Sequence, residues 1–160
     1  MDAMDEKFVS RLIESSMRQS RSGMAVCRII QDPEGNPVDF EFVEANEAYE
    51  ALIGIPERII VGQKASSLFH GHFKENDEWL AICGDIALNG GNQIIEWESR
   101  VIGKWLRVNI LCPHPGYFTM FLFDITRVKK SEEALKLTER ELRNIVENAP
   151  VGLYRQTPDG

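Results

Sequence analysis

Three β-rich runs follow one another in the last third of the 160-residue chain, with only short turns between them. The runs cover residues 93–102, 105–112 and 117–125. The connections, Gly103-Lys104 and Pro113-His114-Pro115-Gly116, contain the Gly and Pro residues that tight turns use. Because connections this short join antiparallel strands, the region is predicted to form an antiparallel meander.

A strand pair and several helices are predicted ahead of the meander. The runs 24–30 and 38–45 flank a turn rich in Pro and Gly, which is typical of a hairpin. Asn46 suits the N-cap of a short helix over residues 47–53, and the spacing of apolar residues predicts a longer helix over residues 75–88. Two strands, then helices, then three strands predict an α+β fold in which short helices face one five-stranded antiparallel sheet.

An amphipathic helix is predicted within residues 1–22. Apolar residues recur there at spacings of three and four, so one stripe of the helix needs another surface to cover it. Because an exposed apolar stripe marks an interaction surface, Phe8, Leu12 and Ile13 are predicted to contribute to a homodimer.

The composition changes to Lys, Glu, Arg and Leu over residues 127–148, a segment with neither Gly nor Pro. Val128, Leu135 and Leu142 recur every seven residues, which is the repeat of a coiled coil. The segment is therefore predicted to form a parallel coiled-coil helix, weak alone because Ser and Thr occupy the half-heptad positions.

A partial internal repeat lies at the end of the chain. Features of residues 12–35 recur, with different spacing, over residues 145–160, so the chain is predicted to be a fragment that stops early in a second domain. The predicted division is residues 1–22 for the N-terminal helix, 23–126 for the folded domain, 127–148 for the coiled-coil helix and 149–160 for the truncated second domain.

Charge and composition limit the classes of partner. The chain has 18 basic and 25 acidic residues, whereas a nucleic-acid-binding groove shows a basic excess. No stretch approaches the ~20 apolar residues needed to cross a bilayer, and the acidic N-terminus is unlike a secretory signal. Three cysteines without metal-ligand spacing argue against a disulfide framework and a metal site. A cytoplasmic domain without nucleic-acid or membrane contact is predicted.

Four segments carry a more specific signal. They are residues 46–54 (NEAYEALIG), 61–63 (VGQ), 103–108 (GKWLRV) and 124–126 (DIT), of which the last is the most specific. With the predicted elements, they resemble the PAS, or sensory-box, domain of bacterial signal-transduction proteins. The resemblance covers residues 23–126 and the flanking helices, and it implies a PAS-like sheet.

The resemblance implies a regulatory module that senses a small ligand or a conformational cue. In such proteins the outgoing helix leads to an effector, commonly a histidine kinase or a diguanylate cyclase, and the partial repeat favours a tandem-PAS parent. Asp124 and Thr126 are predicted to cap that helix and, with Val128, Leu135 and Leu142, to relay the signal. A ligand-free interaction or dimerisation module is the alternative.

Aromatic residues on the longer helix and the meander predict a pocket between the two layers, with a plain aromatic core as the alternative. The candidate pocket residues are Tyr49, Trp79, Cys83, Trp97, Trp105, Asn109, Phe121 and Phe123. No cofactor is predicted. The helix over residues 75–88 lacks the His that haem-binding relatives use, and the Asn-Cys-Arg-Phe stretch of flavin-binding relatives is absent. An unidentified small molecule remains open, and no catalytic motif supports an enzyme.

Overall fold

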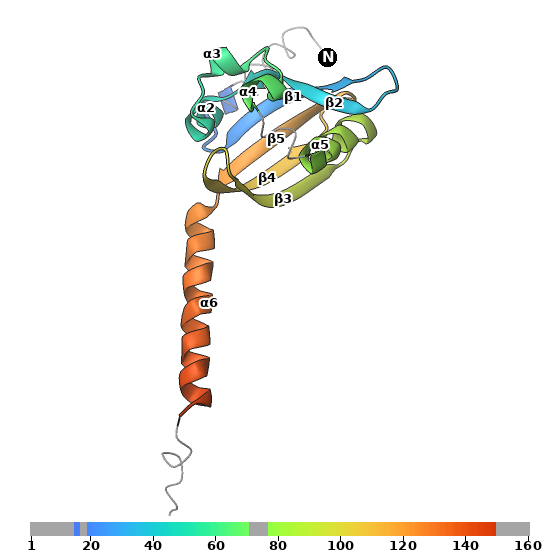
Figure 1. Cartoon of the computed structure of the whole chain (residues 1–160). Coiled ribbons are helices and arrows are strands. Elements are labelled where there is room, and N and C mark those ends of the chain that lie inside the picture. The colour runs from blue at the N-terminus through green and yellow to red at the C-terminus, as the bar shows by residue number, and fades with distance from the viewer. Residues whose placement is uncertain (1–14, 17–18, 71–76, 150–160) are drawn as a thin grey trace, which may run out of the picture. The chain divides into compact units, whose positions relative to one another are not determined.

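The structure, a computed structural model, describes residues 15–16, 19–70 and 77–149 (Figure 1). The chain divides after Asp124 into two units. The first contains a β-sheet with its helices, and the described part of the second is one long helix. The predicted dimerisation residues Phe8, Leu12 and Ile13 lie outside the described residues.

Five antiparallel strands form one sheet in the order β2-β1-β5-β4-β3 (Figure 1). The hairpin of β1 and β2 and the meander of β3, β4 and β5 are both as predicted, and β1 pairs with β5 to join them. The predicted α+β fold class is therefore confirmed. The strands are β1 (Gly23–Gln31), β2 (Pro37–Ala45), β3 (Asn92–Ser99), β4 (Lys104–Leu111) and β5 (Tyr117–Asp124).

The helices between β2 and β3 lie on one face of the sheet (Figure 1). The predicted N-cap is confirmed, because Asn46 Oδ1 accepts the backbone N–H of Tyr49 at 2.9 Å. The first helix ends at Gly54, whose φ of 78° suits a residue without a Cβ. The helices of this group are α2 (Glu47–Ile53), α3 (Glu57–Ile60), α4 (Ala65–Leu68) and α5 (Asp77–Asn89).

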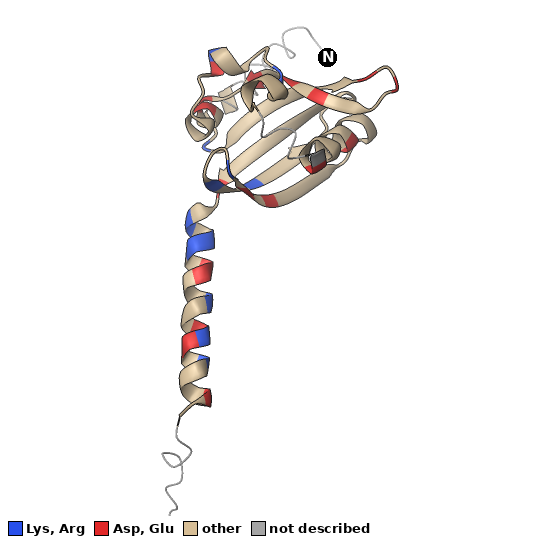
Figure 2. Cartoon of the chain, viewed as in Figure 1, with Lys and Arg blue, Asp and Glu red and all other residues tan. Residues whose placement is uncertain are grey.

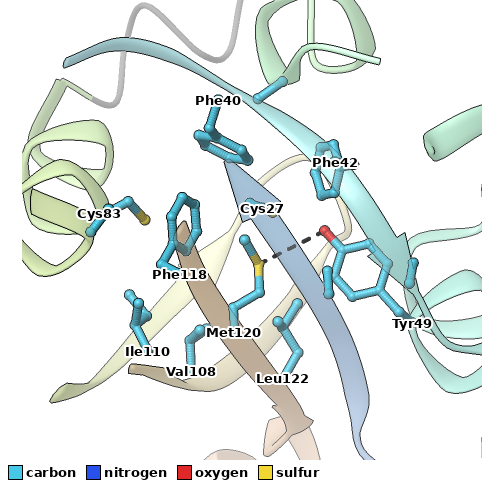
Figure 3. Close-up of a cluster of buried hydrophobic side chains, with 14 of the residues drawn as sticks. Cys27, Phe40, Phe42, Tyr49, Cys83, Val108, Ile110, Phe118, Met120 and Leu122 are labelled. Carbon is cyan, nitrogen blue, oxygen red and sulfur yellow. Dashed lines mark hydrogen bonds between the residues drawn. The ribbon is translucent and has the colours of Figure 1, made fainter. Parts of the chain in front are cut away.

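Side chains along each strand alternate between a helix-facing side and an opposite side. The opposite side carries the ion pairs of Arg28 with Glu41 and of Arg107 with Glu96. The helix-facing side is the core (Figure 3). Its buried strand residues include Ala25, Cys27, Phe40, Phe42, Leu106, Val108, Ile110, Phe118, Met120 and Leu122.

The turn between β3 and β4 is longer than predicted, because β3 ends at Ser99 and not at residue 102. The Ser99 carbonyl accepts the N–H of Gly103 at 2.7 Å, and its hydroxyl accepts the N–H of Ile102 at 3.3 Å. Gly103 completes this turn with a φ of 69°. Lys104, predicted as a turn residue, is the first residue of β4.

Gly84 lets α5 pack closely against the start of β2. A Cβ atom on Gly84 would lie 2.3 Å from Cγ and 2.6 Å from Cβ of Pro37, well inside van der Waals contact. Helix propensity alone favours Ala over Gly by about 1 kcal/mol, so packing and propensity oppose each other at this position.

We expect Gly84→Ala to destabilise the domain by about 1–3 kcal/mol, because the overpacking exceeds the gain in helix propensity. Urea denaturation of the whole chain measures the difference. Ala81→Gly, at an exposed position of the same helix, reports the propensity effect alone. A Gly84→Ala variant as stable as the wild type would contradict the close approach of α5 to Pro37.

Candidate functional site

A cavity of about 80 Å³ lies between the helices and the helix-facing side of the sheet. Every described residue around it is uncharged, and most are aromatic or aliphatic. A water molecule occupies ~30 Å³ of liquid and drug-sized pockets begin at ~300 Å³, so the cavity has room for a few small atoms. The strands contribute Phe40, Phe42, Trp97, Ser99, Leu106, Val108, Met120 and Leu122, and the helices and loops contribute Tyr49, Ile53, Phe69, Trp79, Val101 and Ile102.

Tyr49 is the main polar group of the cavity, and Asn46 sets its position. Asn46 Oδ1 accepts the N–H groups of Tyr49 at 2.9 Å and of Met24 at 2.8 Å, while its amide nitrogen donates to the Ser22 carbonyl at 3.1 Å. These bonds fix the first turn of α2 against the start of β1. The Tyr49 ring then packs beside Phe42, with ring centroids 5.9 Å apart.

The Tyr49 hydroxyl points into the core and donates to Met120 Sδ at 4.0 Å (Figure 3). A thioether sulfur is a weak acceptor, so this is a weak hydrogen bond for a phenol that is only 2% exposed. Burial, and to a lesser degree the thiols of Cys27 and Cys83, raise the pKa of Tyr49 well above its usual range. The hydroxyl therefore keeps its proton and remains a donor.

Trp79 on α5 and Trp97 on β3 form one wall of the cavity. Their ring centroids lie 4.8 Å apart at an angle of 58°. The same two residues also border an open groove, together with Glu78, Ile82, Ile95 and Glu96. The tryptophan pair thus lines both the cavity and this groove.

The structure brings three of the predicted pocket residues together at the cavity: Tyr49, Trp79 and Trp97. Cys83 is fully buried in the core beside the cavity without lining it. Burial raises the pKa of the Cys83 thiol, as expected for a packing residue rather than a reactive one.

Trp105, Asn109, Phe121 and Phe123 are not at the cavity, because they point to the opposite face of the sheet. Successive strand residues face opposite sides of the sheet. The predicted Phe121 and Phe123 therefore lie on the face opposite to Met120 and Leu122, which line the cavity. The sequence does contain a signal for β4. Arg107 is charged and must face away from the core, which predicts that its neighbours Leu106 and Val108 face inward.

The end of β5 borders a second, open groove. Asp124 forms an ion pair with Lys104 at 3.3 Å, and both residues line this groove. Leu122 lines both the groove and the cavity. The cap predicted at Thr126 is displaced by one residue, because the following helix already includes Thr126 and its N-cap is Ile125, whose hydrocarbon side chain makes no capping hydrogen bond.

The second unit contains α6 (Thr126–Glu147), one residue out of step with the predicted 127–148. None of its side chains is buried. The predicted relay residues Val128, Leu135 and Leu142 are 51%, 61% and 57% exposed. They leave an apolar stripe of α6 without a covering surface within this unit.

Neither a metal site nor a membrane-spanning helix is found in the described part of the chain. No group of three or more His, Cys, Asp and Glu residues in these ranges could hold a metal ion. Within residues 15–16, 19–70 and 77–149, no helix is both long enough and apolar enough to span a bilayer.

We expect Asn46→Ala to destabilise the domain by about 2–3 kcal/mol, because it removes the cap of α2 and leaves buried backbone groups without a partner. Asn46→Asp keeps an acceptor for both N–H groups and should cost less. Urea denaturation of both variants measures the order. An Asn46→Ala variant within about 0.5 kcal/mol of the wild type would show that this amide does not hold α2.

Comparison with solved structures identifies the architecture. An RNA-binding light-oxygen-voltage receptor has a TM-score of 0.56 at 18% identity, over 87% of this chain and 39% of that one. The LOV protein of Rhodobacter sphaeroides has a TM-score of 0.55 at 22% identity, over 84% of this chain and 74% of that one. A domain of the sensory box sensor histidine kinase/response regulator from Geobacter sulfurreducens has a TM-score of 0.52 at 16% identity, over 74% of this chain and 96% of that domain.

No protein-family model matches the chain, and no curated protein matches it. This chain spans well under half of the light-oxygen-voltage receptor, so the similarity concerns one domain of that protein. At these identities it establishes the fold. The strand order, the helices on one face and the three similar structures show that the chain has the PAS, or sensory-box, fold.

Proposed function

We propose that this chain is a non-enzymatic sensory module of a cytoplasmic signalling protein. Occupancy of the cavity by a small ligand, or a conformational cue at the same place, is relayed through α6 to an effector farther along the polypeptide. The effector is a histidine kinase or a diguanylate cyclase, and the active form is a homodimer. The proposed ligand is neither haem nor flavin, which the small volume of the cavity supports.

One observation carries this proposal: β5 is both a wall of the cavity and the strand that leads into α6. Met120 and Leu122 of β5 line the cavity. The strand ends at Asp124, and α6 begins at Thr126. A change in side-chain packing at the cavity therefore acts on the strand that immediately precedes the helix.

The surface of α6 supports assembly with a second copy. Val128, Leu135 and Leu142 form an exposed seam with a seven-residue period, and acidic and basic residues interleave along the helix (Figure 2). The hydroxyls of Ser131 and Thr138 donate to backbone carbonyls of their own helix, each at 3.0 Å. These polar seam residues therefore need no partner from the other helix, which lowers the cost of covering them.

We expect Leu135→Lys to weaken self-association by at least about tenfold, because it places a charge in the apolar seam. Leu137→Lys is the matched control, since Leu137 is 58% exposed on the same turn but lies off the seam. Sedimentation equilibrium near ~100 μM measures both. A monomeric wild type, or equal effects of the two substitutions, would rule out the coiled-coil dimer.

A second candidate function is a ligand-free interaction or dimerisation module. The small volume of the cavity favours it, because about 80 Å³ is well below the usual size of a ligand pocket. The two functions differ in whether the cavity influences α6. Native mass spectrometry of freshly purified protein adds a direct search for bound small molecules.

We expect Val108→Ile, which adds one methylene group to the cavity wall, to change the dimer dissociation constant by about fivefold or more. Val108 is fully buried and lies opposite Leu122 in the sheet. Val43→Ile makes the same change at a position of β2 that is 44% exposed, and should have no effect. Equal dissociation constants for the two variants would refute the relay and favour the interaction module.

A further inference from the structure

The hydroxyl of Tyr49 is a buried donor whose only described acceptor is poor. It lies in the wall of the cavity and donates to Met120 Sδ at 4.0 Å. A carbonyl or other oxygen acceptor forms a much stronger hydrogen bond than a thioether does. If the Tyr49 hydroxyl turns from the Met120 sulfur to an oxygen acceptor of a molecule in the cavity, it loses a weak hydrogen bond and gains a stronger one.

The volume limits the size of any occupant. An engineered apolar cavity of about 150 Å³ holds benzene, with its six carbon atoms. The same packing in about 80 Å³ leaves room for roughly three or four non-hydrogen atoms. Larger molecules require the walls to move apart.

The charge distribution limits the kind of occupant. Burying an ion without a counter-charge is costly, and no described residue lining the cavity is charged. The groove that Trp79 and Trp97 also border includes Glu78 and Glu96, and the Glu96 carboxylate is paired with Arg107 at 2.7 Å on the opposite face of the sheet. Anions are thus disfavoured inside the cavity.

We propose that the cavity binds a small uncharged molecule of about three or four non-hydrogen atoms whose single acceptor, of the carbonyl type, takes the hydrogen bond of Tyr49. This inference deepens the proposed sensory function and rests on it. Ligand binding replaces the contact between Tyr49 and Met120, which frees the Met120 side chain on β5. The chemical class is a short neutral carbonyl compound.

Two probes of the same shape test the acceptor. Acetone carries the carbonyl oxygen, and 2-methylpropene, supplied as a gas under pressure, replaces that oxygen by a methylene group. Binding is followed through the indole N–H signals in ¹H–¹⁵N spectra of the full chain. Trp79 and Trp97 line the cavity and should shift, whereas Trp105, on the other face of the sheet, is an internal control.

The measured quantity is the ratio of the acetone affinity to the 2-methylpropene affinity, determined in the wild type and in each variant. The different hydration of the two probes contributes equally to every ratio, so it cancels when variants are compared. We expect Tyr49→Phe to lower this ratio by about 3- to 10-fold, the value of one hydrogen bond. Met120→Leu removes the competing sulfur and should raise the ratio. Tyr117→Phe deletes the same hydroxyl from a tyrosine that does not line the cavity, and should leave the ratio unchanged.

A ratio that stays within about twofold of the wild type in either variant, provided that the variant is folded, overturns the proposal, as does a wild type in which neither probe shifts Trp79 or Trp97. The two variants change the ratio in opposite directions, so a folding defect in one still leaves the other decisive. The readout is occupancy of the cavity and does not depend on α6. A failed relay test with Val108→Ile is therefore distinguishable from a failure here.

Discussion

The side-chain amide of Asn46 is the interaction on which the geometry of the cavity depends. It is 4% exposed and bonds to backbone groups of Ser22, Met24 and Tyr49, so it joins the start of β1 to the first turn of α2. Gly23 permits this approach, since a Cβ there would lie 3.1 Å from the Cα of Tyr49. The position of the Tyr49 hydroxyl thus follows from one amide and one missing side chain.

The order of the elements was predictable from the sequence, but the faces of the meander were not. Turn residues and apolar spacing are local signals, so the hairpin, the cap at Asn46 and the meander were found. In β5, Phe121 and Phe123 on one face are as apolar as Met120 and Leu122 on the other, so the alternation of apolar and polar residues does not reveal the inner face. Met120 and Leu122 were not predicted to line the pocket, because the prediction relied on aromatic side chains, and Phe121 and Phe123 of β5 face the other side of the sheet.

Leu122 connects the cavity to the end of the sheet. It borders both the cavity and the groove that contains Lys104 and Asp124, and its partner on β1 is Gly23, which has no side chain. Tyr49 and Leu52 of α2 fill the space where a side chain of Gly23 would lie, so Leu122 lies beside the helix that positions the Tyr49 hydroxyl. Because protein cores are densely packed, an occupant of the cavity would shift Leu122 between discrete positions rather than by gradual deformation.

The size of the cavity also sets an upper limit on affinity. The best small ligands gain about 1.5 kcal/mol per non-hydrogen atom, so an occupant of four atoms gains at most about 6 kcal/mol. This corresponds to a dissociation constant on the order of 10–100 μM. In the described residues every buried side-chain nitrogen and oxygen already has a partner, so no buried polar group depends on a ligand for its hydrogen bond. A molecule of the proposed class would therefore need to be abundant to fill the site, and it would leave readily when its concentration fell.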